Sequence, residues 1–246
     1  MCDNGLPGIF VPEEEPMADR MDTTAGVAIM KPAVQVAQPA ASEKPTDASI
    51  AMTTASVGQD PTWPQHHYYD EYRQLFSTVE ARSIVELSNV LERQESRLQT
   101  GTGRPLRDCS IFWIHRGQGV DWILDRVARM VHAWNQSYRF EIATGQPAAA
   151  QLTLYRASQE YSWHMDLGAG PASLRKVSVV VGLNDPSHYT GGGTEIFYGG
   201  GESPTLRLGA GDAICFPPYV MHRAVPVETG ERWTLAMWFL GDRPFR

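Results

Sequence analysis

The chain has 246 residues, 42% of them hydrophobic, which supplies enough apolar side chains for one sizeable core and makes one domain the default. Its net charge is -7, and residues 1–60 account for nine acidic against three basic side chains, so the near-neutral remainder lacks the basic surface that a nucleic-acid partner requires. Cys2, Cys109 and Cys215 lie far apart without a CxxC spacing, which argues against a disulfide framework and a cysteine zinc site.

The N-terminal segment, residues 1–63, is rich in Ala, Pro, Thr, Met and Glu and shows neither helical nor strand periodicity. Such a composition cannot bury enough apolar surface to offset its ordering entropy, which predicts a disordered or low-complexity tail before one domain over residues 64–246. A partner-binding tail is the alternative. The sequence shows no leader-like start and no long apolar window, so we expect a cytoplasmic protein without a membrane partner.

Two amphipathic helices are predicted ahead of most of the strands. In residues 77–98 apolar side chains recur at helical spacing, and Ser77 or Thr78 suits the N-cap. In residues 120–136 the apolar side chains form one stripe. Between the two helices, SIFWIH (residues 110–115) is typical of a short buried strand.

From Tyr138 onward the chain is a series of short apolar runs separated by turns that contain Gly, Pro or Asn. This pattern is typical of an antiparallel sandwich or barrel, so the predicted fold class is α+β, mainly β, with two helices packed on a barrel or double sheet. The expected strands are residues 138–143, 150–157, 162–166, 176–183, 194–198, 205–208, 213–216, 222–227 and 232–240.

A histidine and an aspartate stand one residue apart in the stretch YSWHMDLG. In a strand His164 and Asp166 point to one face, while Trp163 and Met165 point to the other. A third candidate ligand, His222, opens a later predicted strand. Two neutral imidazoles and one carboxylate form the facial arrangement that holds Fe(II) and leaves positions open. The alternative is that these are ordinary surface or hydrogen-bonded core residues, because short motifs also occur by chance.

Arg232 begins the apolar run RWTLAMWFL, ten residues after His222. A buried guanidinium is costly without a partner, and no acidic residue within this strand supplies one. A dicarboxylate cosubstrate would supply it, with one carboxylate paired to Arg232 and its 2-oxo acid end on the metal. The alternative is that Arg232 reaches solvent or pairs with Glu228 or Glu231 at the turn.

Several spaced motifs together resemble a known family: QLTLYRASQEYSWHMD, RKVSVVVGLND, YTGGGTEIF and GDAICFPPYVMHRAVPVETGERWTLAMWF. They are similar to the catalytic core of the prolyl 4-hydroxylase-like (PKHD-type) Fe(II)/2-oxoglutarate-dependent dioxygenases, over roughly residues 105–241. The resemblance implies a double-stranded β-helix (jelly-roll) barrel with flanking N-terminal helices. It implies that His164, Asp166 and His222 bind iron, and that Arg232 binds the outer carboxylate of 2-oxoglutarate with help from Tyr155.

The same resemblance implies a chemistry. Fe(II), 2-oxoglutarate and O₂ are the expected cofactors and cosubstrates, with ascorbate as an accessory reductant. The expected reaction is hydroxylation of an aliphatic C–H in a prolyl or other amino-acid residue of a peptide, protein or small molecule, with release of succinate and CO₂. Because Asp166 occupies the position that related halogenases leave to halide, hydroxylation is favoured over halogenation. Arg175, Ser178 and Trp238 match pocket-lining positions of the family. Arg232 stands where many prolyl hydroxylases have Lys, which leaves the subgroup open.

The turn between the last two predicted strands bears on Arg232. A two-residue turn would make Arg232 face away from His222. A three-residue loop over 228–230, with Gly230 in the left-handed conformation, pairs Pro226 with Arg232 and puts His222 and Arg232 on one face. We therefore predict the three-residue loop.

Three other functions stay open from the sequence. A cupin-like metal enzyme without cosubstrate would share the barrel and the histidines but leaves Arg232 unexplained. A nucleic-acid demethylase of the same superfamily would share the ligands, yet the near-neutral core lacks a basic face. A non-enzymatic interaction module would use the tail and not depend on His164.

Overall fold

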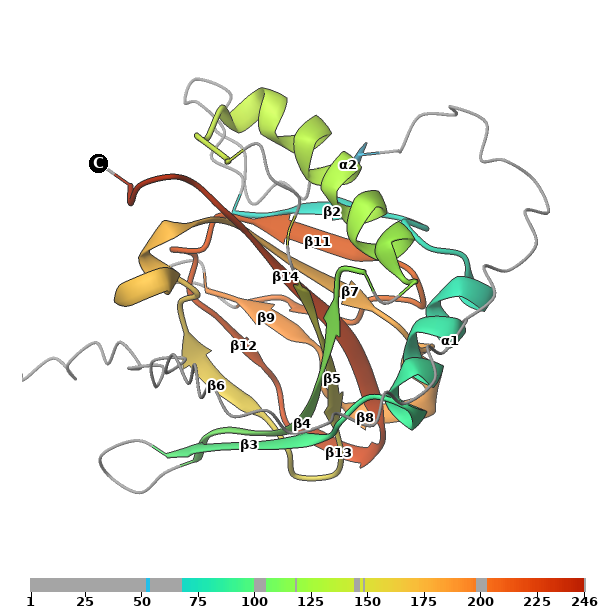
Figure 1. The fold of residues 1–246 in the computed structure, drawn as a ribbon. Helices are drawn as coiled ribbons and strands as arrows, with labels where there is room; N and C mark the ends of the chain where they lie inside the picture. Colours follow the sequence, from blue (N-terminus) through green and yellow to red (C-terminus); the bar gives the residue numbers. More distant parts are fainter. Residues whose placement is uncertain are drawn as a thin grey trace, which may run out of the picture.

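The computed structural model of the chain describes residues 52–53, 68–99, 105–117, 119–143, 147, 149–197 and 203–245. Its centre is a curled antiparallel sheet, and two helices pack against the outside of that sheet (Figure 1). This curled, mainly β arrangement with two helices confirms the predicted jelly roll. The interior of the curl is the place where a site can form, because strands from both halves of the sheet face it.

Twelve strands form one hydrogen-bonded sheet. The larger half contains, in spatial order, β1 (Met52–Thr53), β2 (Asp70–Tyr72), β11 (Ala213–Phe216), β7 (Arg175–Gly182), β14 (Arg232–Leu240), β5 (Ala149–Tyr155) and β4 (Pro105–His115), with β3 (Gln94–Gln99) paired to β4. The smaller half contains β6 (Tyr161–His164), β12 (His222–Ala224), β9 (Thr194–Ile196) and β10 (Thr205–Leu206). The halves meet where Arg107 of β4 pairs with Tyr161 of β6. A separate two-stranded sheet joins β8 (Tyr189–Gly191) and β13 (Val227–Gly230).

Strict alternation along the central strands separates a helix-facing side from an interior side. On β5 the side chains of Ala150, Leu152 and Leu154 join the core that also contains the helices. The intervening residues Gln151, Thr153 and Tyr155 line the interior pocket. On β14 the same division places Leu235, Met237 and Phe239 in the core and Arg232, Thr234, Ala236 and Trp238 at the pocket. Because the side-chain period of a strand is two, burying one face against the helices fixes which residues face the interior.

Helix α2 (Asp121–Tyr138) confirms the second predicted helix and lies across the larger half of the sheet (Figure 1). Its buried stripe consists of Ile123, Leu124, Val127, Ala128, Met130, Val131 and Trp134. Since these side chains share one core with β5, β7 and β14, the helix holds the rear of the pocket wall in place.

The first predicted helix is correct at its start and wrong at its end. Helix α1 (Thr78–Glu86) begins at a capping box, in which Ser77 Oγ accepts from the Glu80 N–H at 3.2 Å and Glu80 accepts from the Ser77 N–H at 2.8 Å. A short 3₁₀ turn, η1 (Leu87–Asn89), follows, and the chain then enters strand β3.

The predicted helical continuation to residue 98 is therefore replaced by a strand. Residues 94–98 each pair with a residue of β4, from Gln94 with Ile111 to Leu98 with Arg107. The apolar residues that suggested the longer helix include Val90, which is 54% exposed. Pairing with a long neighbouring strand satisfies the backbone here, and this gain outweighs a weak local helical pattern.

The strand predicted over residues 138–143 is also wrong. Helix α2 continues to Tyr138 and ends at Arg139, which has the left-handed conformation with φ 56° and ψ 34°. The Asn135 side chain holds the turn, because its Oδ1 accepts from the Phe140 N–H at 2.8 Å and its Nδ2 donates to the Phe140 carbonyl at 2.9 Å. Phe140 then packs against Trp134 instead of entering a sheet.

The hairpin predicted between residues 222–227 and 232–240 does not form. Strand β12 pairs with β6 and β9, β13 pairs with β8, and β14 pairs with β5 and β7. Gly230 has the expected positive φ of 78°, but it sits within β13 against the carbonyl of His188. The inward orientation of Arg232 is correct nevertheless, because its pairing with Tyr155 of β5 sets it.

Most of the predicted N-terminal tail lies outside the described residues. Within it, Met52 and Thr53 form β1 and pair with Tyr72 and Glu71 of β2.

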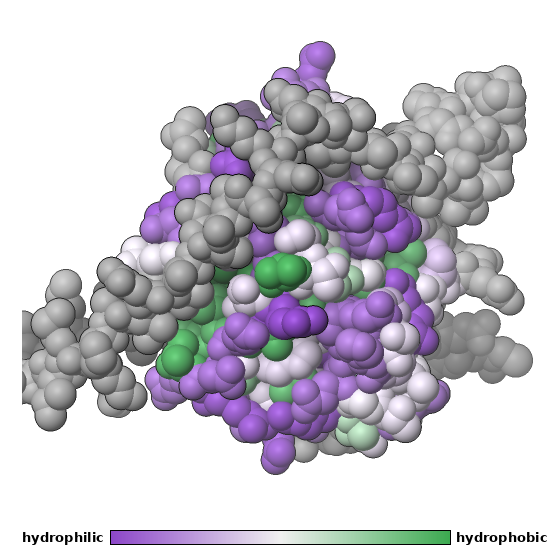
Figure 2. All heavy atoms as spheres, turned by 90° about the vertical axis from the view of Figure 1, so that its right-hand side faces the viewer, coloured by the Kyte–Doolittle hydropathy of each residue, from purple (hydrophilic) through white to green (hydrophobic). Residues whose placement is uncertain are grey.

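The face that carries α1 is largely hydrophilic, with scattered apolar side chains, as expected for the outside of a packed domain (Figure 2). Among the described helices, none combines the length and apolarity needed to span a bilayer.

Candidate functional site

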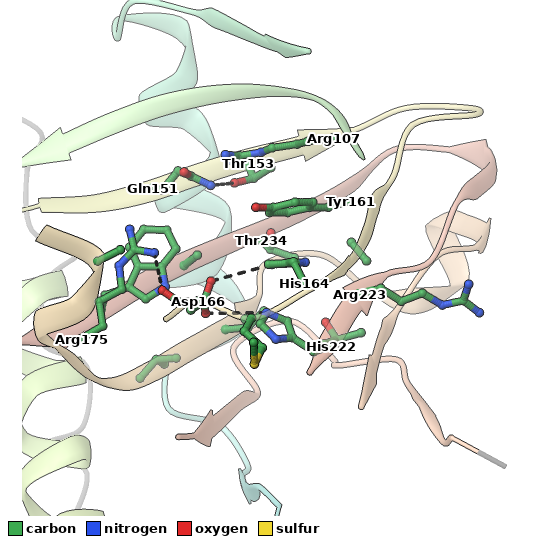
Figure 3. Close-up of a pocket in the computed structure, with 18 of the residues that line it drawn as sticks. Arg107, Gln151, Thr153, Tyr161, His164, Asp166, Arg175, His222, Arg223 and Thr234 are labelled. Carbon is green, nitrogen blue, oxygen red and sulfur yellow. Dashed lines mark hydrogen bonds and ion pairs between the residues drawn. The ribbon is translucent and has the colours of Figure 1, made fainter. Parts of the chain in front are cut away.

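The structure brings His164, Asp166 and His222 together in the interior of the curl (Figure 3). His164 ends β6, His222 begins β12, and the two residues are direct cross-strand partners. Asp166 lies two residues beyond the end of β6, where its N–H donates to the carbonyl of Pro218 at 2.9 Å. All three side chains are buried, so the sequence-predicted ligand set converges on one point.

The three candidate ligand atoms face one another. His164 Nε2 lies 3.8 Å from Asp166 Oδ1, and His222 Nε2 lies 3.7 Å from Asp166 Oδ2. Behind each imidazole, Nδ1 contacts a backbone carbonyl: that of Ser162 at 2.8 Å for His164 and that of Val220 at 3.0 Å for His222. A backbone acceptor at Nδ1 puts the proton there and leaves the Nε2 lone pair for a metal.

The charges at this point also suit a metal. Burial lowers the pKa of His164, and the adjacent His222 ring lowers it further, so the imidazole is neutral at physiological pH. Burial alone would raise the pKa of Asp166, but the adjacent His222 and His164 rings, the Arg175 guanidinium and a hydrogen bond from Ser178 lower it overall. Ser178 Oγ donates to Asp166 Oδ2 at 2.6 Å, and Arg175 donates to the Asp166 carbonyl at 2.9 Å. A neutral imidazole and an ionised carboxylate are the protonation states that bind a divalent cation.

Strict alternation describes only part of the stretch YSWHMDLG. Trp163 points away from the ligands, where it packs edge-on against Phe197 and lies under the Arg223 guanidinium at 4.8 Å. Met165, however, lines the pocket instead of facing away from it. The reason is that β6 ends at His164, so the residues after it follow a bend and no longer alternate.

Arg232 lies at another part of the same pocket and is 4% exposed. Its Nη2 donates to Thr194 Oγ1 at 2.8 Å, and its guanidinium lies 5.5 Å from the ring centre of Tyr155. Among the described residues no carboxylate forms an ion pair with Arg232, and Glu231 instead pairs with Arg156 at 3.0 Å. The pocket therefore presents a buried guanidinium whose protein partner is a neutral hydroxyl.

The family-matched positions Arg175 and Trp238 line the pocket, with the Arg175 guanidinium 4.3 Å from the Trp238 ring centre, and Ser178 contacts Asp166 as described. Sequence reasoning missed other pocket residues: Arg107, Gln151, Thr153, Tyr161 as a pocket residue, and Thr194. A signal for two of them was present, because Gln151 and Thr153 alternate with apolar residues in the run AQLTLY. Arg107 carried no such signal.

The fold and the site together define a class: a jelly-roll protein with a His–Asp–His facial triad and a buried arginine in one pocket. Two neutral imidazoles with one carboxylate are the donor set of non-haem Fe(II) sites. The residues present therefore fit an iron ion, and the buried Arg232 fits the free carboxylate of a dicarboxylate.

The chain is similar to known proteins of one family. Residues 150–240 match the family model described as the 2OG-Fe(II) oxygenase superfamily. A PKHD-type hydroxylase of Xylella fastidiosa (strain 9a5c) is 36% identical over 98 residues, covering 36% of this chain and 42% of that protein. A PKHD-type hydroxylase of Synechococcus sp. (strain CC9605) is 30% identical over 82 residues, covering 33% and 37%. Residues 150–240 are thus similar to the 2OG-Fe(II) oxygenase superfamily, and the chain spans only about two fifths of the length of these curated relatives.

Solved structures share the fold. A prolyl-4-hydroxylase of Pseudomonas putida superposes with a TM-score of 0.59 at 23% identity, over 71% of this chain and 93% of that one. A prolyl hydroxylase of Trichoplax adhaerens, in complex with a peptide fragment of a hypoxia inducible factor, gives 0.54 at 14% identity, over 71% and 84%. At these identities the similarity supports the jelly roll and its topology.

Proposed function

We propose that this protein is an Fe(II)- and 2-oxoglutarate-dependent dioxygenase that hydroxylates an aliphatic C–H. The observation that carries the proposal is the presence, in one pocket, of three converging candidate ligand atoms and of a buried arginine with which no carboxylate of the described residues pairs. A metal site alone would suit many enzymes, but the second feature calls for an anionic cosubstrate.

Each residue of the triad has a defined task in this proposal. His164 and His222 hold the metal through Nε2, and their Nδ1 contacts with backbone carbonyls keep both rings oriented. Asp166 supplies the negative ligand, held by Ser178. The chemistry that the bound metal supplies is activation of O₂, coupled to decarboxylation of 2-oxoglutarate to succinate and CO₂.

Arg232 binds the outer carboxylate of 2-oxoglutarate in this proposal, with Thr194 fixing the guanidinium and Tyr155 beside it. A planar guanidinium can donate two parallel hydrogen bonds to a carboxylate, which fixes orientation as well as position. The burial of the whole group keeps water away from this pair and strengthens it.

For the substrate, we propose a prolyl or other amino-acid residue in a peptide, protein or small molecule. The support is the PKHD-type hydroxylases among the relatives and the prolyl hydroxylases among the similar structures, one of them bound to a peptide. A cytoplasmic location and the use of ascorbate remain predictions from the sequence.

The experiment is an anaerobic titration of the protein with Fe(II) and 2-oxoglutarate by calorimetry, followed by measurement of succinate formation in air. We expect binding of both ligands by the wild type and loss of 2-oxoglutarate binding in Arg232→Ala. Arg156→Ala is the matched control, because this exposed arginine pairs with Glu231 outside the pocket. Metal binding without 2-oxoglutarate binding would instead favour a cupin-like enzyme.

A further inference from the structure

A second arginine lies in the pocket at the junction of the two halves of the sheet. Arg107 of β4 lines the pocket, and its guanidinium carbon lies 5.0 Å from the ring centre of Tyr161 (Figure 3). The ring of Tyr161 stacks in turn on His164, with centroids 3.5 Å apart. The ring of Tyr161 thus lies between the Arg107 guanidinium and His164, one of the proposed metal ligands (Figure 3).

Arg107 lacks a carboxylate partner among the described residues. Its hydrogen bond runs from Nε to Cys109 Sγ at 3.3 Å, and the two Nη groups take no part in it. Cys109 is buried and its pKa is raised by burial, so it is a neutral thiol. A guanidinium has five N–H donors, and most of those on Arg107 remain available to a ligand.

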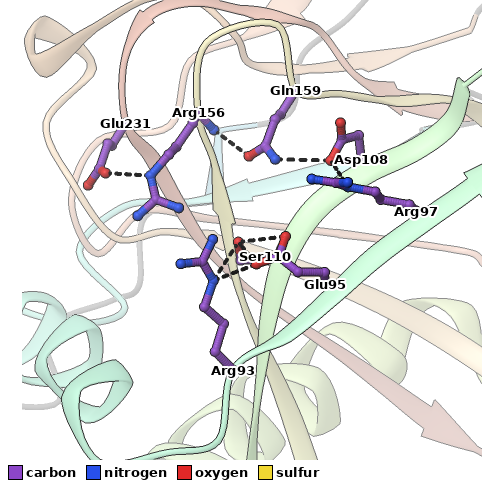
Figure 4. Close-up of polar contacts among 8 residues, drawn as sticks. All are labelled: Arg93, Glu95, Arg97, Asp108, Ser110, Arg156, Gln159 and Glu231. Carbon is purple, nitrogen blue, oxygen red and sulfur yellow. Dashed lines mark hydrogen bonds and ion pairs between the residues drawn. The ribbon is translucent and has the colours of Figure 1, made fainter.

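The neighbouring carboxylate of Asp108 does not pair with Arg107, because it makes its contacts on the outer face of the sheet. The side chain of Asp108 alternates to that face, where it accepts from Gln159 at 3.0 Å and lies 3.8 Å from Arg97 (Figure 4). Other arginines of the described chain do have ion-pair partners: Arg73, Arg93, Arg97, Arg116, Arg126, Arg156, Arg223 and Arg243. Arg107 differs from these eight arginines because it lines the pocket without a carboxylate partner among the described residues.

The charge of the pocket lining is positive. Arg107 and Arg232 line the pocket, and among its described lining residues the carboxylate is that of Asp166, while Arg223 is neutralised by Glu195 at 2.6 Å and points away from the site (Figure 3). A divalent metal and a 2-oxoglutarate dianion cancel each other. The loaded pocket would still hold an excess of positive charge, which favours an anionic second substrate.

We propose that Arg107 binds a carboxylate of the substrate, so that the preferred substrate is an amino acid, C-terminal residue or acidic peptide segment with an anionic group beside the hydroxylated carbon. This inference rests on the proposed function and names the class of its substrate. Gln151 and Thr153 line the same pocket as Arg107 (Figure 3), are joined by a 2.9 Å hydrogen bond, and offer further polar contacts. Arg232 binds the carboxylate of the cosubstrate and Arg107 binds that of the substrate, so each arginine has one anionic ligand.

The test compares matched acids and amides. Protein loaded anaerobically with Mn(II) and 2-oxoglutarate is titrated by calorimetry with three pairs: L-proline and L-prolinamide, N-acetyl-L-proline and its amide, and the blocked dipeptides Pro-Glu and Pro-Gln. The three pairs distinguish a free amino acid, a C-terminal residue and an acidic side chain as the source of the carboxylate. In at least one pair we expect the acid to bind about tenfold more tightly than its amide, or better, as for other hydrogen bonds to charged groups.

The variants assign that preference to Arg107. Arg107→Gln should bring the affinity ratio of acid to amide close to one, and Arg107→Lys should keep part of it. Arg97→Gln, a change of an arginine on the outer face of the same hairpin, should leave the ratio unchanged. If Arg107→Gln fails to fold, the wild type and the Lys variant still give the ratio.

Two results would overturn the inference: no preference for any acid in the wild type, including the absence of binding, or a preference that survives in Arg107→Gln. Failure of the proposed function looks different, because the Mn(II)-loaded wild type would then not bind 2-oxoglutarate before any substrate is added. The two ideas can thus fail separately.

Discussion

The proposed metal end and the proposed anion end of the pocket are built by different means. At the metal end, His164 and His222 come from strands of four and three residues in the smaller half of the sheet, and Asp166 lies beyond a strand end. At the anion end, Tyr155 and Arg232 come from strands of seven and nine residues in the larger half. The first end depends on individual hydrogen bonds to backbone carbonyls, and the second on sheet register.

This difference has a physical reason. A metal requires three atoms at defined angles, so each ligand needs its own orienting partner, such as the Val220 carbonyl behind His222. An arginine that binds a carboxylate needs mainly a fixed position in the pocket and an environment without water. A long, regular strand provides both. Substitutions at the two ends should therefore affect different ligands, and four predictions test this separation.

The largest effect is expected for His222→Ala at the metal end. Loss of a direct ligand should weaken Mn(II) binding by about 100-fold or more, because loss of even an outer hydrogen-bond partner costs 10–100-fold. Electron paramagnetic resonance titration of free Mn(II) measures this. His132→Ala, which changes an exposed histidine of α2, is the control. Equal Mn(II) affinity in both variants would exclude His222 as a ligand.

At the anion end, Arg232→Met should weaken 2-oxoglutarate binding by about 100-fold, from the loss of two charge-assisted hydrogen bonds. Arg232→Lys should show a smaller loss, because it keeps the charge without the planar fork. Calorimetry at saturating Mn(II) gives both values, and the Mn(II) affinity itself should stay within a few-fold. A matching loss of metal affinity would contradict the separation of the two ends.

Ser178→Ala probes the metal end more gently. Asp166 would lose its 2.6 Å hydrogen bond, and Mn(II) affinity should fall by about tenfold, the lower range for an outer partner. Ser173→Ala is the control, since the Ser173 hydroxyl bonds to the Gly170 carbonyl on an exposed turn. If both variants bind Mn(II) like the wild type, the bond to Asp166 does not orient the ligand.

The smallest effect is expected for Thr194→Val, which removes the hydroxyl that accepts from Arg232 without changing side-chain shape. Loss of the hydrogen bond that orients Arg232 should cost about 1 kcal/mol of binding free energy, which predicts a 2-oxoglutarate affinity about fivefold lower with Mn(II) binding unchanged. Thr190→Val, at an exposed threonine paired with Thr229, is the control. An unaltered affinity in Thr194→Val would show that the sheet alone positions the guanidinium.

The local sequence was most informative where a pattern had a single reading. The spacing of His164 and Asp166, the position of His222 at the start of a predicted strand and the arginine opening RWTLAMWFL predicted candidate residues that the structure brings into one pocket. It was least informative where a pattern had two readings. Residues 94–98 could continue a helix or pair as a strand, and only the presence of β4 beside them selects the strand.

Long-range pairing could not be read from one sequence. The hairpin predicted after His222 assumed that neighbours in the chain pair in space, whereas in the jelly roll β12 pairs with β6 and β9 and β14 with β5 and β7. Arg232 faces inward because Tyr155 is its partner across the sheet, and not because of the turn before it.

What the sequence determined by itself was the chemistry available: two imidazoles, one carboxylate and one arginine placed by strand periodicity, with apolar residues between them that must be buried. Only the tertiary structure decided that these groups share one pocket and that Arg107 joins them. The reason is that alternation assigns a residue to a face of its own strand, while the pairing of distant strands decides which faces meet.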